Sequence, residues 1–250
     1  MIELKSARDR EKMRRAGRVV AEVLAELRNA VRPGITTRDL DQVADHGIRA
    51  RQGIPVFKGY HGYPASVCVS VNDQVVHGIP GLTVLKPGDL VSIDLGATVD
   101  GFVGDAAFSM FVGEPPDQRA EELLRVTEEA LYLGIQQAQV GHRLGDISAA
   151  VQQHVEAHGF SVVRDFVGHG IGRQMHEEPQ VPNYGTAGRG ILLKPGLAIA
   201  IEPMVNLGGH AVDVGDDGWT VTTRDHSLSA HFEHTIFIDE DGPEILTTIS

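Results

Sequence analysis

The sequence contains a single cysteine, Cys68, in 250 residues, which excludes an intrachain disulfide. It also lacks any run approaching the ~20 apolar residues of a membrane helix, and its first residues carry no apolar segment like that of a signal peptide. Lysine and arginine (22) are outnumbered by aspartate and glutamate (34), so the formal net charge is −12. Such a chain has no broad electrostatic reason to bind nucleic acid or an anionic membrane. We therefore expect a globular, cytoplasmic protein.

Helical and extended patterns alternate along the chain, which predicts an α+β protein. Apolar residues at helical spacing follow Ser6 and again follow Thr36 or Thr37, each a favourable N-cap. A long helix is predicted from residue 117 to about 140, and Asp146 is expected to cap another that ends near residue 158. Residues 54–113 and the last 90 or so residues read mainly as strands, turns and loops.

Two stretches of the sequence resemble each other at nearly one offset. Residues 86–94 read Lys-Pro-Gly-Asp-Leu-Val-Ser-Ile-Asp, and residues 194–202 read Lys-Pro-Gly-Leu-Ala-Ile-Ala-Ile-Glu, 108 positions later. Upstream, Gly34 matches Gly141 at an offset of 107. We expect one catalytic domain over residues 1–250, built from similar α+β halves of about 1–113 and 114–250. A pseudo-twofold arrangement would bring the acid that ends each repeated strand to a shared site.

The first half contains a predicted hairpin that carries two acids. Asp100 and Gly101 lie between β-prone segments, the pattern typical of a two-residue hairpin turn. Such a turn puts Asp94 opposite Ala107, and Asp105 then projects from the same face as Asp94. Two buried carboxylates this close repel each other, so either one is protonated or a cation lies between them. The alternative is that both are exposed hairpin residues.

The second half offers a comparable pair of acids. Glu202 ends the second copy of the repeated strand, and residues 231–238 read as a further strand with His231 and Glu233 on one face. Taken alone, Glu202 would more often be solvated or salt-bridged. The connection between the two glutamates is long and contains the only tryptophan, Trp219, so we expect it to form a wall of a pocket.

Three histidine patterns complete the candidate site. The glycine-rich loop Gly168–Gly172 fails the dinucleotide fingerprint because Arg173 replaces the third glycine, and its glycines would let His169 approach a metal. His176 does not begin an HExxH zinc signature, and His77 reads equally well as a half-buried strand residue. Four carboxylates with one imidazole suit two divalent ions of the Mn²⁺, Fe²⁺ or Co²⁺ type, whose usual chemistry is hydrolysis.

These motifs, in order along nearly the whole chain, resemble those of type I methionine aminopeptidases. The matching segments are Tyr60–Pro64, Asn72–Pro80, Ile93–Asp94, Asp100–Asp105, Gly168–Gly172, His176–Pro179, Ile201–Met204 and Phe232–Thr235. The resemblance implies the pita-bread (creatinase/aminopeptidase) fold, with two pseudo-twofold-related α+β halves around a central metal site. It also implies removal of the initiator methionine from nascent proteins when the second residue is small.

The resemblance assigns functions to particular residues. Two divalent ions (Co²⁺, Mn²⁺, Fe²⁺ or Zn²⁺) would be bound, with Asp105 and Glu233 as the bridging pair. His77 would contact the scissile amide, His176 would hydrogen-bond the substrate carbonyl, and Glu202 would act as a base. The implied metal ligands are Asp94, Asp105, His169, Glu202 and Glu233, and the implied methionine pocket consists of Tyr60, Tyr63, Cys68, Met175 and Trp219.

Three positions depart from the pattern of that family without removing a ligand. Met175 stands where phenylalanine is common, His231 where glutamine is common, and Phe57 where cysteine often occurs. Met175 and Phe57 would change the shape of the methionine pocket. His231 would change the hydrogen bonds around the metal ligands.

Two other activities remain as alternatives. One is an X-Pro-type aminopeptidase or prolidase of the same fold, although those enzymes usually carry an additional N-terminal domain. The other is a non-catalytic pita-bread protein that binds peptides. For the aminopeptidase we expect a monomer that acts on the N-terminal methionine of nascent polypeptides in the cytoplasm. Transient contact with the ribosome is expected without a dedicated N-terminal module, and no nucleic-acid or membrane binding is expected.

Overall fold

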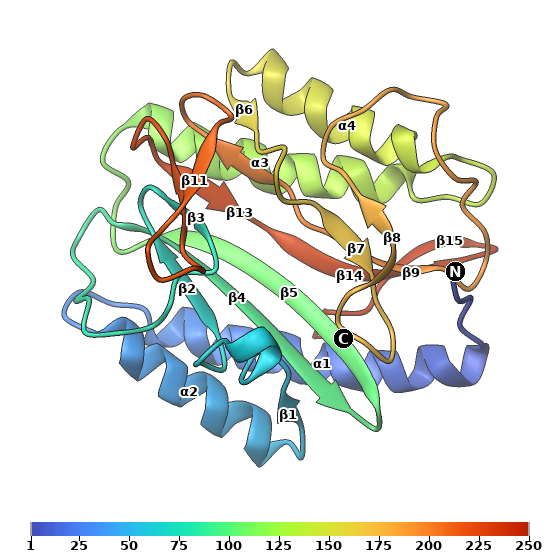
Figure 1. Cartoon of the computed structure of the whole chain (residues 1–250), viewed down its shortest axis with the longest axis horizontal. Helices are drawn as coiled ribbons and strands as arrows, with labels where there is room; N and C mark the ends of the chain where they lie inside the picture. The colour runs from blue at the N-terminus through green and yellow to red at the C-terminus, as the bar shows by residue number, and fades with distance from the viewer. Residues whose placement is uncertain (1, 250) are drawn as a thin grey trace.

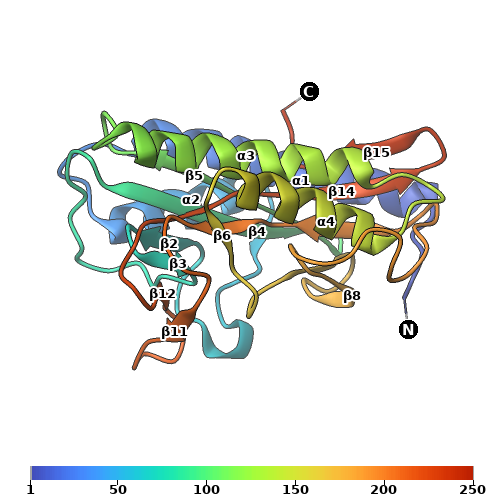
Figure 2. The ribbon, with the colours of Figure 1, turned by 90° about the horizontal axis from the view of Figure 1, so that it is seen from above.

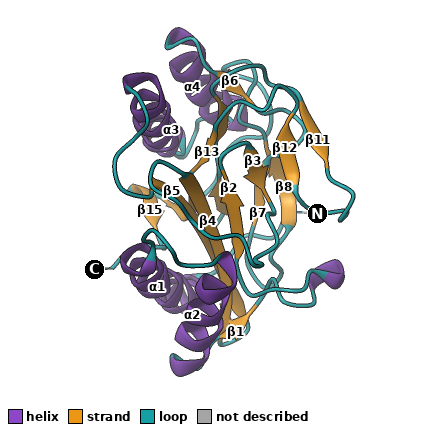
Figure 3. Cartoon of the chain, turned by 90° about the vertical axis from the view of Figure 1, so that its left-hand side faces the viewer, coloured by secondary structure: helices purple, strands orange, loops and turns teal. Residues whose placement is uncertain are grey.

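The computed structural model describes residues 2–249 as a curved central sheet with four helices on one face. The helices lie in two pairs, α1 beside α2 and α3 beside α4 (Figure 3). Small sheets and loops lie on the opposite face (Figure 2). Within residues 2–249, no helix is both long and apolar enough to span a membrane. The helices are α1 (Ala7–Ala30), α2 (Thr37–Ala50), α3 (Gln118–Gln137) and α4 (Leu144–Ala157), with a 3-10 turn, η1, at Tyr60–Gly62.

Capping residues set where the helices begin. The Ser6 hydroxyl accepts from the Asp9 amide, and the Asp9 carboxylate accepts from the Ser6 amide, so both ends of a capping box are satisfied. Thr36 caps α2 in the same way. The predicted cap of α4 was wrong by three residues, because the N-cap is Arg143 and Asp146 lies inside the first turn. Its carboxylate accepts from the amide of the N-cap residue, Arg143, at 2.7 Å.

Nine antiparallel strands form the central sheet (Figure 1). Seven follow the order β1-β4-β5-β14-β9-β7-β8, while β2 pairs with β4 and β15 with β14. Two three-stranded sheets, β13-β10-β6 and β11-β12-β3, complete the β-structure. The strands are β1 (Ile54–Pro55), β2 (Cys68–Val71), β3 (Gln74–Val76), β4 (Leu90–Val99), β5 (Phe102–Phe111), β6 (Ser161–Val162), β7 (Gly168–Gly170), β8 (Glu177–Val181), β9 (Ala198–Ile201), β10 (Met204–Asn206), β11 (Val212–Val214), β12 (Val221–Thr223), β13 (Ser229–His231), β14 (Glu233–Asp239) and β15 (Gly242–Ile245).

The register of the β4–β5 hairpin is the one that the Asp-Gly pair predicts. Asp100 and Gly101 both have positive φ, 50° and 76°, which is the conformation of a type I′ turn. Asp94 is therefore paired with Ala107. On the other side of β5, Ala107 is paired with Glu233 of β14. Two acids from different halves thus flank one small residue in the same row of the sheet.

The predicted continuous strand over residues 231–238 is interrupted at Phe232. His231 ends β13, which pairs with β10, whereas Glu233 begins β14, which pairs with β5 and β9. Ser109 explains the break, because its hydroxyl accepts from the His231 amide and donates to the His231 carbonyl, each at 2.8 Å. A side chain thereby satisfies the backbone groups that would otherwise pair with a neighbouring strand.

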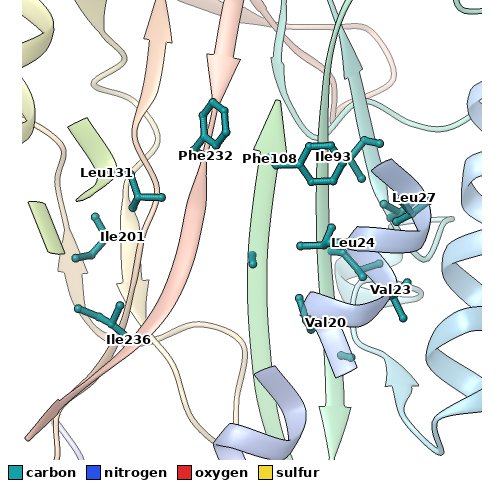
Figure 4. Packing of buried hydrophobic residues seen from close by; sticks show 14 of the residues in the cluster. Val20, Val23, Leu24, Leu27, Ile93, Phe108, Leu131, Ile201, Phe232 and Ile236 are labelled. Carbon is teal, nitrogen blue, oxygen red and sulfur yellow. The ribbon is translucent and has the colours of Figure 1, made fainter. Parts of the chain in front are cut away.

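The apolar core lies between the helices and the sheet (Figure 4). Leu24 of α1 belongs to the same buried cluster as Phe108 of β5, and Leu131 of α3 lies in that cluster with Ile201 and Ile236 from β9 and β14. Full burial of one such side chain contributes about 1.5–3 kcal/mol. The helix α1 therefore packs against the acid-bearing strands β4 and β5, and α3 packs against β9 and β14.

Candidate metal centre and active site

The strands bring together the acids that the sequence singled out. Asp94 and Asp105 project from β4 and β5, Glu233 begins β14, and Glu202 directly follows β9. His169 lies on β7, which pairs with β9. All five side chains line one cavity.

Potential ligand atoms lie close enough to surround cations. Asp105, His169 and Glu233 each offer one atom, and these atoms lie within 4.8 Å of one another. Glu202 and Glu233 form a second such group with His231. The two groups share Glu233, and His169 Nε2 lies 3.5 Å from Glu202 Oε1, so the groups are contiguous.

Burial of these acids is costly unless a cation compensates them. Asp105 and Glu233 are only 3% and 2% exposed. Within residues 2–249, Asp94 Oδ1, Asp105 Oδ1 and Glu233 Oε1 have no hydrogen-bond partner, and neither lysine nor arginine lines the cavity. Burial raises the pKa of Asp94 to about 7, and burial with mutual repulsion raises the pKa of Glu233 well above its usual value. The donor set therefore fits divalent cations.

His169 is oriented as a metal ligand would be. Its Nδ1 donates to the Gly170 carbonyl at 2.9 Å, which leaves Nε2 facing Glu202. Burial, with a smaller contribution from the nearby His176, lowers the pKa of His169 to about 3 and keeps the imidazole neutral.

The glycines beside His169 form part of a strand rather than the expected loop. A Cβ on Gly168 would collide with the Ala200 carbonyl oxygen, and one on Gly170 would collide with the Glu178 carbonyl oxygen. Glycine is needed here because β7 packs closely between β8 and β9, not because the chain bends.

Two further histidines line the cavity above the acids. The Nδ1 of His176 lies 2.7 Å from the Tyr60 hydroxyl. His77 directly follows β3, and its ring meets Phe166 and Trp219 edge to face, with centroids 5.6 and 6.2 Å away. Burial lowers the pKa of His77 to about 4.

The rest of the cavity, whose volume is about 160 Å³, is mainly apolar. All five residues expected in the methionine pocket line it, as does Phe57, one of the three departures. Cys68 is paired with Asp94 across the sheet, and burial raises the pKa of its thiol, so it is no nucleophile. The expected lining residues are Tyr60, Tyr63, Cys68, Met175 and Trp219.

Sequence reasoning missed part of this lining. Phe166 and Val167 precede the glycine-rich segment, Met204 lies two residues after Glu202, and Val76 precedes His77. Their proximity in sequence to predicted site residues is a usable signal. The sequence pattern does not reveal that the fold turns each of these side chains toward the cavity.

Comparison with known proteins identifies the family. The profile of metallopeptidase family M24 matches residues 11–240. A methionine aminopeptidase of Clostridium perfringens is 54% identical over 249 residues and covers 100% of both chains. The crystal structure of a methionine aminopeptidase from Thermotoga maritima, 50% identical, superposes over 100% of both chains with a TM-score of 0.98.

A more distant structure shares only the fold. Prolidase from Pyrococcus furiosus is 20% identical and has a TM-score of 0.75, and the match covers 99% of this chain and 66% of the prolidase. The architecture is the pita-bread fold expected from the sequence. The chain belongs to metallopeptidase family M24 and, within it, to the methionine aminopeptidases.

Proposed function

We propose that this chain removes the N-terminal methionine from polypeptides whose second residue is small, using a pair of divalent ions. One observation carries the proposal: unpartnered buried carboxylates from both halves meet at an apolar cavity of limited volume. Family M24 comprises metallopeptidases, so divalent metal ions belong to such a site. Relatives about 50% identical over the full length are named methionine aminopeptidases, which supports this substrate over X-Pro peptides.

We assign the metal ligands to Asp94, Asp105, His169, Glu202 and Glu233. As the motif match implies, Asp105 and Glu233 would be the bridging pair; their strands are adjacent and their ligand atoms lie within 4.8 Å. When bound, two divalent ions lower the pKa of a shared water and polarise the peptide carbonyl. Co²⁺, Mn²⁺, Fe²⁺ and Zn²⁺ all suit this mixed oxygen and nitrogen donor set.

The residues of the chain then position the substrate and move protons. Glu202, whose Oε1 lies 3.5 Å from His169 Nε2 within the ligand set, would accept the proton of the attacking water as ligand and base together. The proposed mechanism uses the tautomer in which the Tyr60 hydroxyl donates to His176 Nδ1, so that Nε2 of His176 carries the hydrogen and donates to the substrate carbonyl. His77, neutral at physiological pH, contacts the scissile amide.

The cavity selects the side chain of the first residue. Tyr63, Met175 and Trp219 form apolar walls, which suit a flexible thioether. The free amino group of the substrate would lie next to the buried acids, which limits cleavage to the first peptide bond. The apolar segments around Phe57 and Met204 close the remaining sides.

We further propose that residues 1–250 act as one catalytic domain, monomeric and in the cytoplasm, on nascent polypeptides that meet it in transient contact with the ribosome. The single buried cysteine and the net charge of −12 support this setting. The two acid pairs support the single domain, because each half supplies an incomplete ligand set.

Hydrolysis of Met-Ala-Ser and Ala-Pro-Ala by chelated protein, with Mn²⁺, Fe²⁺, Co²⁺ or Zn²⁺ added back singly, tests the proposal. We expect cleavage of Met-Ala-Ser only, and only after metal is restored. Preferential cleavage of Ala-Pro-Ala would support the proline-specific alternative. Metal uptake without cleavage of either peptide would support a non-catalytic binding protein.

A further inference from the structure

His231 is a buried histidine beside the metal centre to which the proposed mechanism gives no function. It is 1% exposed and ends β13, where its amide and carbonyl are both held by the Ser109 hydroxyl. Within residues 2–249, its Nε2 atom has no hydrogen-bond partner. A rigid backbone therefore aims an unsatisfied ring nitrogen into the site.

Two carboxylates face that nitrogen. His231 Nε2 lies 3.9 Å from Glu202 Oε2 and 4.0 Å from Glu233 Oε2. The second oxygen of Glu202, Oε1, lies 3.5 Å from His169 Nε2. The Glu202 carboxylate is thus flanked by two imidazoles, one toward each oxygen.

These separations are too long for hydrogen bonds and suit a shared cation. A hydrogen bond from a ring N–H to a carboxylate spans about 2.7–3.2 Å. A cation midway between two atoms that are ~4 Å apart lies about 2 Å from each, the usual length of a bond from zinc to nitrogen or oxygen. In the tautomer with hydrogen on Nδ1, the lone pair of Nε2 faces both carboxylates, an arrangement that a cation between them stabilises.

We propose that His231 is a further metal ligand, which binds through Nε2 the ion held between Glu202 and Glu233. The inference rests on the proposed function and adds a second imidazole to the ligand set. Imidazole favours Zn²⁺, Fe²⁺ and other metals of intermediate softness, whereas an all-carboxylate set suits Mn²⁺ and Mg²⁺. His231 should therefore shift metal preference away from Mn²⁺.

X-ray absorption spectroscopy of the wild-type protein with one and two equivalents of Zn²⁺ tests the ligand count directly. We expect the spectra to require two imidazoles in total, from His169 and His231. The His231→Gln variant should require one. The control is His234→Gln, which removes a half-buried histidine whose Nδ1 contacts the Thr247 hydroxyl at 2.8 Å, away from the cavity. That control should keep two imidazoles.

Metal competition provides a second measurement that does not depend on catalysis. In His231→Gln we expect the Kd for Zn²⁺ to rise by more than about 100-fold, beyond the ~10–100-fold that loss of an outer-shell partner usually costs, and the preference for Zn²⁺ over Mn²⁺ to fall. Glutamine can still hydrogen-bond Glu202, so unchanged affinity with one imidazole in wild type would overturn the proposal in favour of a hydrogen-bonding function.

If the proposed metal-dependent function is itself wrong, the Zn²⁺ measurements should give a different result. In that case, wild-type protein would bind no Zn²⁺ stoichiometrically, or its spectra would require no imidazole at all. Because the count is made on the wild-type protein, poor folding of His231→Gln would leave the decisive result intact.

Discussion

The two pairs of acid-bearing strands have a similar backbone arrangement but are joined by different connections. In the first half, 11 positions separate Asp94 from Asp105, and a two-residue turn joins their strands. In the second half, 31 positions separate Glu202 from Glu233, and the intervening chain forms β10 to β13. Both pairs present their acids on the same face of one sheet. The first half therefore supplies two acids from a short hairpin. The longer connection of the second half also supplies Trp219 of the pocket wall and an additional histidine, His231.

Matching backbone turns precede both pairs. Gly34 and Gly141 each have a φ of 89°, and Gly88 and Gly196 have φ of 88° and 89°. These offsets of 107 and 108 residues are those of the sequence repeat. The difference between the halves thus lies in what was inserted between the acid-bearing strands, not in how those strands are held.

The largest effect should come from removing one bridging acid from either half. Asp105→Asn and Glu233→Gln should each lower kcat for Met-Ala-Ser by more than about 100-fold, because each leaves the two ions with only one shared carboxylate. Bound metal, measured by inductively coupled plasma mass spectrometry, should fall below two ions per chain. Asp213→Asn is the control, because that exposed acid pairs only with Arg224 on the surface. Near-normal activity in one bridging variant alone would show that the halves are not equivalent.

The acids of both halves should also make stabilisation by metal depend on pH. Burial raises the pKa of Asp94 from 3.8 to about 7, and the other three acids shift upward too. In metal-free protein this contribution to stability is complete below the unfolded pKa and is lost as pH rises through the folded pKa. Divalent ions compensate the ionised acids, so the gain in Tm on adding metal should grow from about pH 5.5 to about pH 8.

Calorimetry with metal and with chelator at each pH measures this gain. Histidines of the unfolded chain titrate near 6.5 in both samples, so their contribution cancels in the difference. A gain that shrinks as pH rises would contradict burial of uncompensated acids at the centre.

A smaller effect is expected from Trp219, the part of the pocket wall that lies in the longer connection of the second half. Trp219→Ala should raise KM for Met-Ala-Ser about tenfold, because the substrate side chain loses apolar contact, while bound metal stays unchanged. The control is Tyr184→Ala, an exposed aromatic residue outside the cavity. If Trp219→Ala instead lowers metal content, the second connection supports the ligands as well as the pocket.

The smallest expected effect is a difference in stability between alanine variants of two glycines that occupy equivalent turns. Gly88→Ala places a side chain in a left-handed turn with nothing within 4 Å of its Cβ, which should cost about 1–2 kcal/mol of unfolding free energy. Gly196→Ala has the same strain, and its Cβ would also lie 2.8 Å from the Lys5 carbonyl oxygen. Urea denaturation should therefore find the second variant less stable. Equal losses of unfolding free energy would mean that the backbone at Lys5 moves away from the added methyl group without an energetic cost.

The sequence predicted the features that depend on local chemistry. The cap at Ser6, the cap at Thr36 (one of the two positions predicted for α2) and the register that pairs Asp94 with Ala107 follow from turn and capping rules, and the structure confirms them, whereas the cap predicted for α4 was wrong. The break at Phe232 was missed, because it depends on the hydroxyl of Ser109, which is distant in sequence.

The side chains of the site divide in the same way, into those that the local sequence predicts and those that depend on the fold. The motifs predicted which residues would line the cavity, from Tyr60 to Trp219, and all of them do. The strand around His169 was mistaken for a loop, since glycines that permit close packing look the same in sequence as glycines that permit bending. Lining residues such as Phe166 carry no pattern of their own and became visible only with the fold.

Anomalous diffraction from crystals of the Mn²⁺-loaded protein would test most directly whether the two halves build one metal centre. We predict two peaks ~3.5–4 Å apart, both within bonding distance of Asp105 and of Glu233. An ion held by the acids of a single half, or two ions too far apart to share a carboxylate, would contradict a centre shared between the halves.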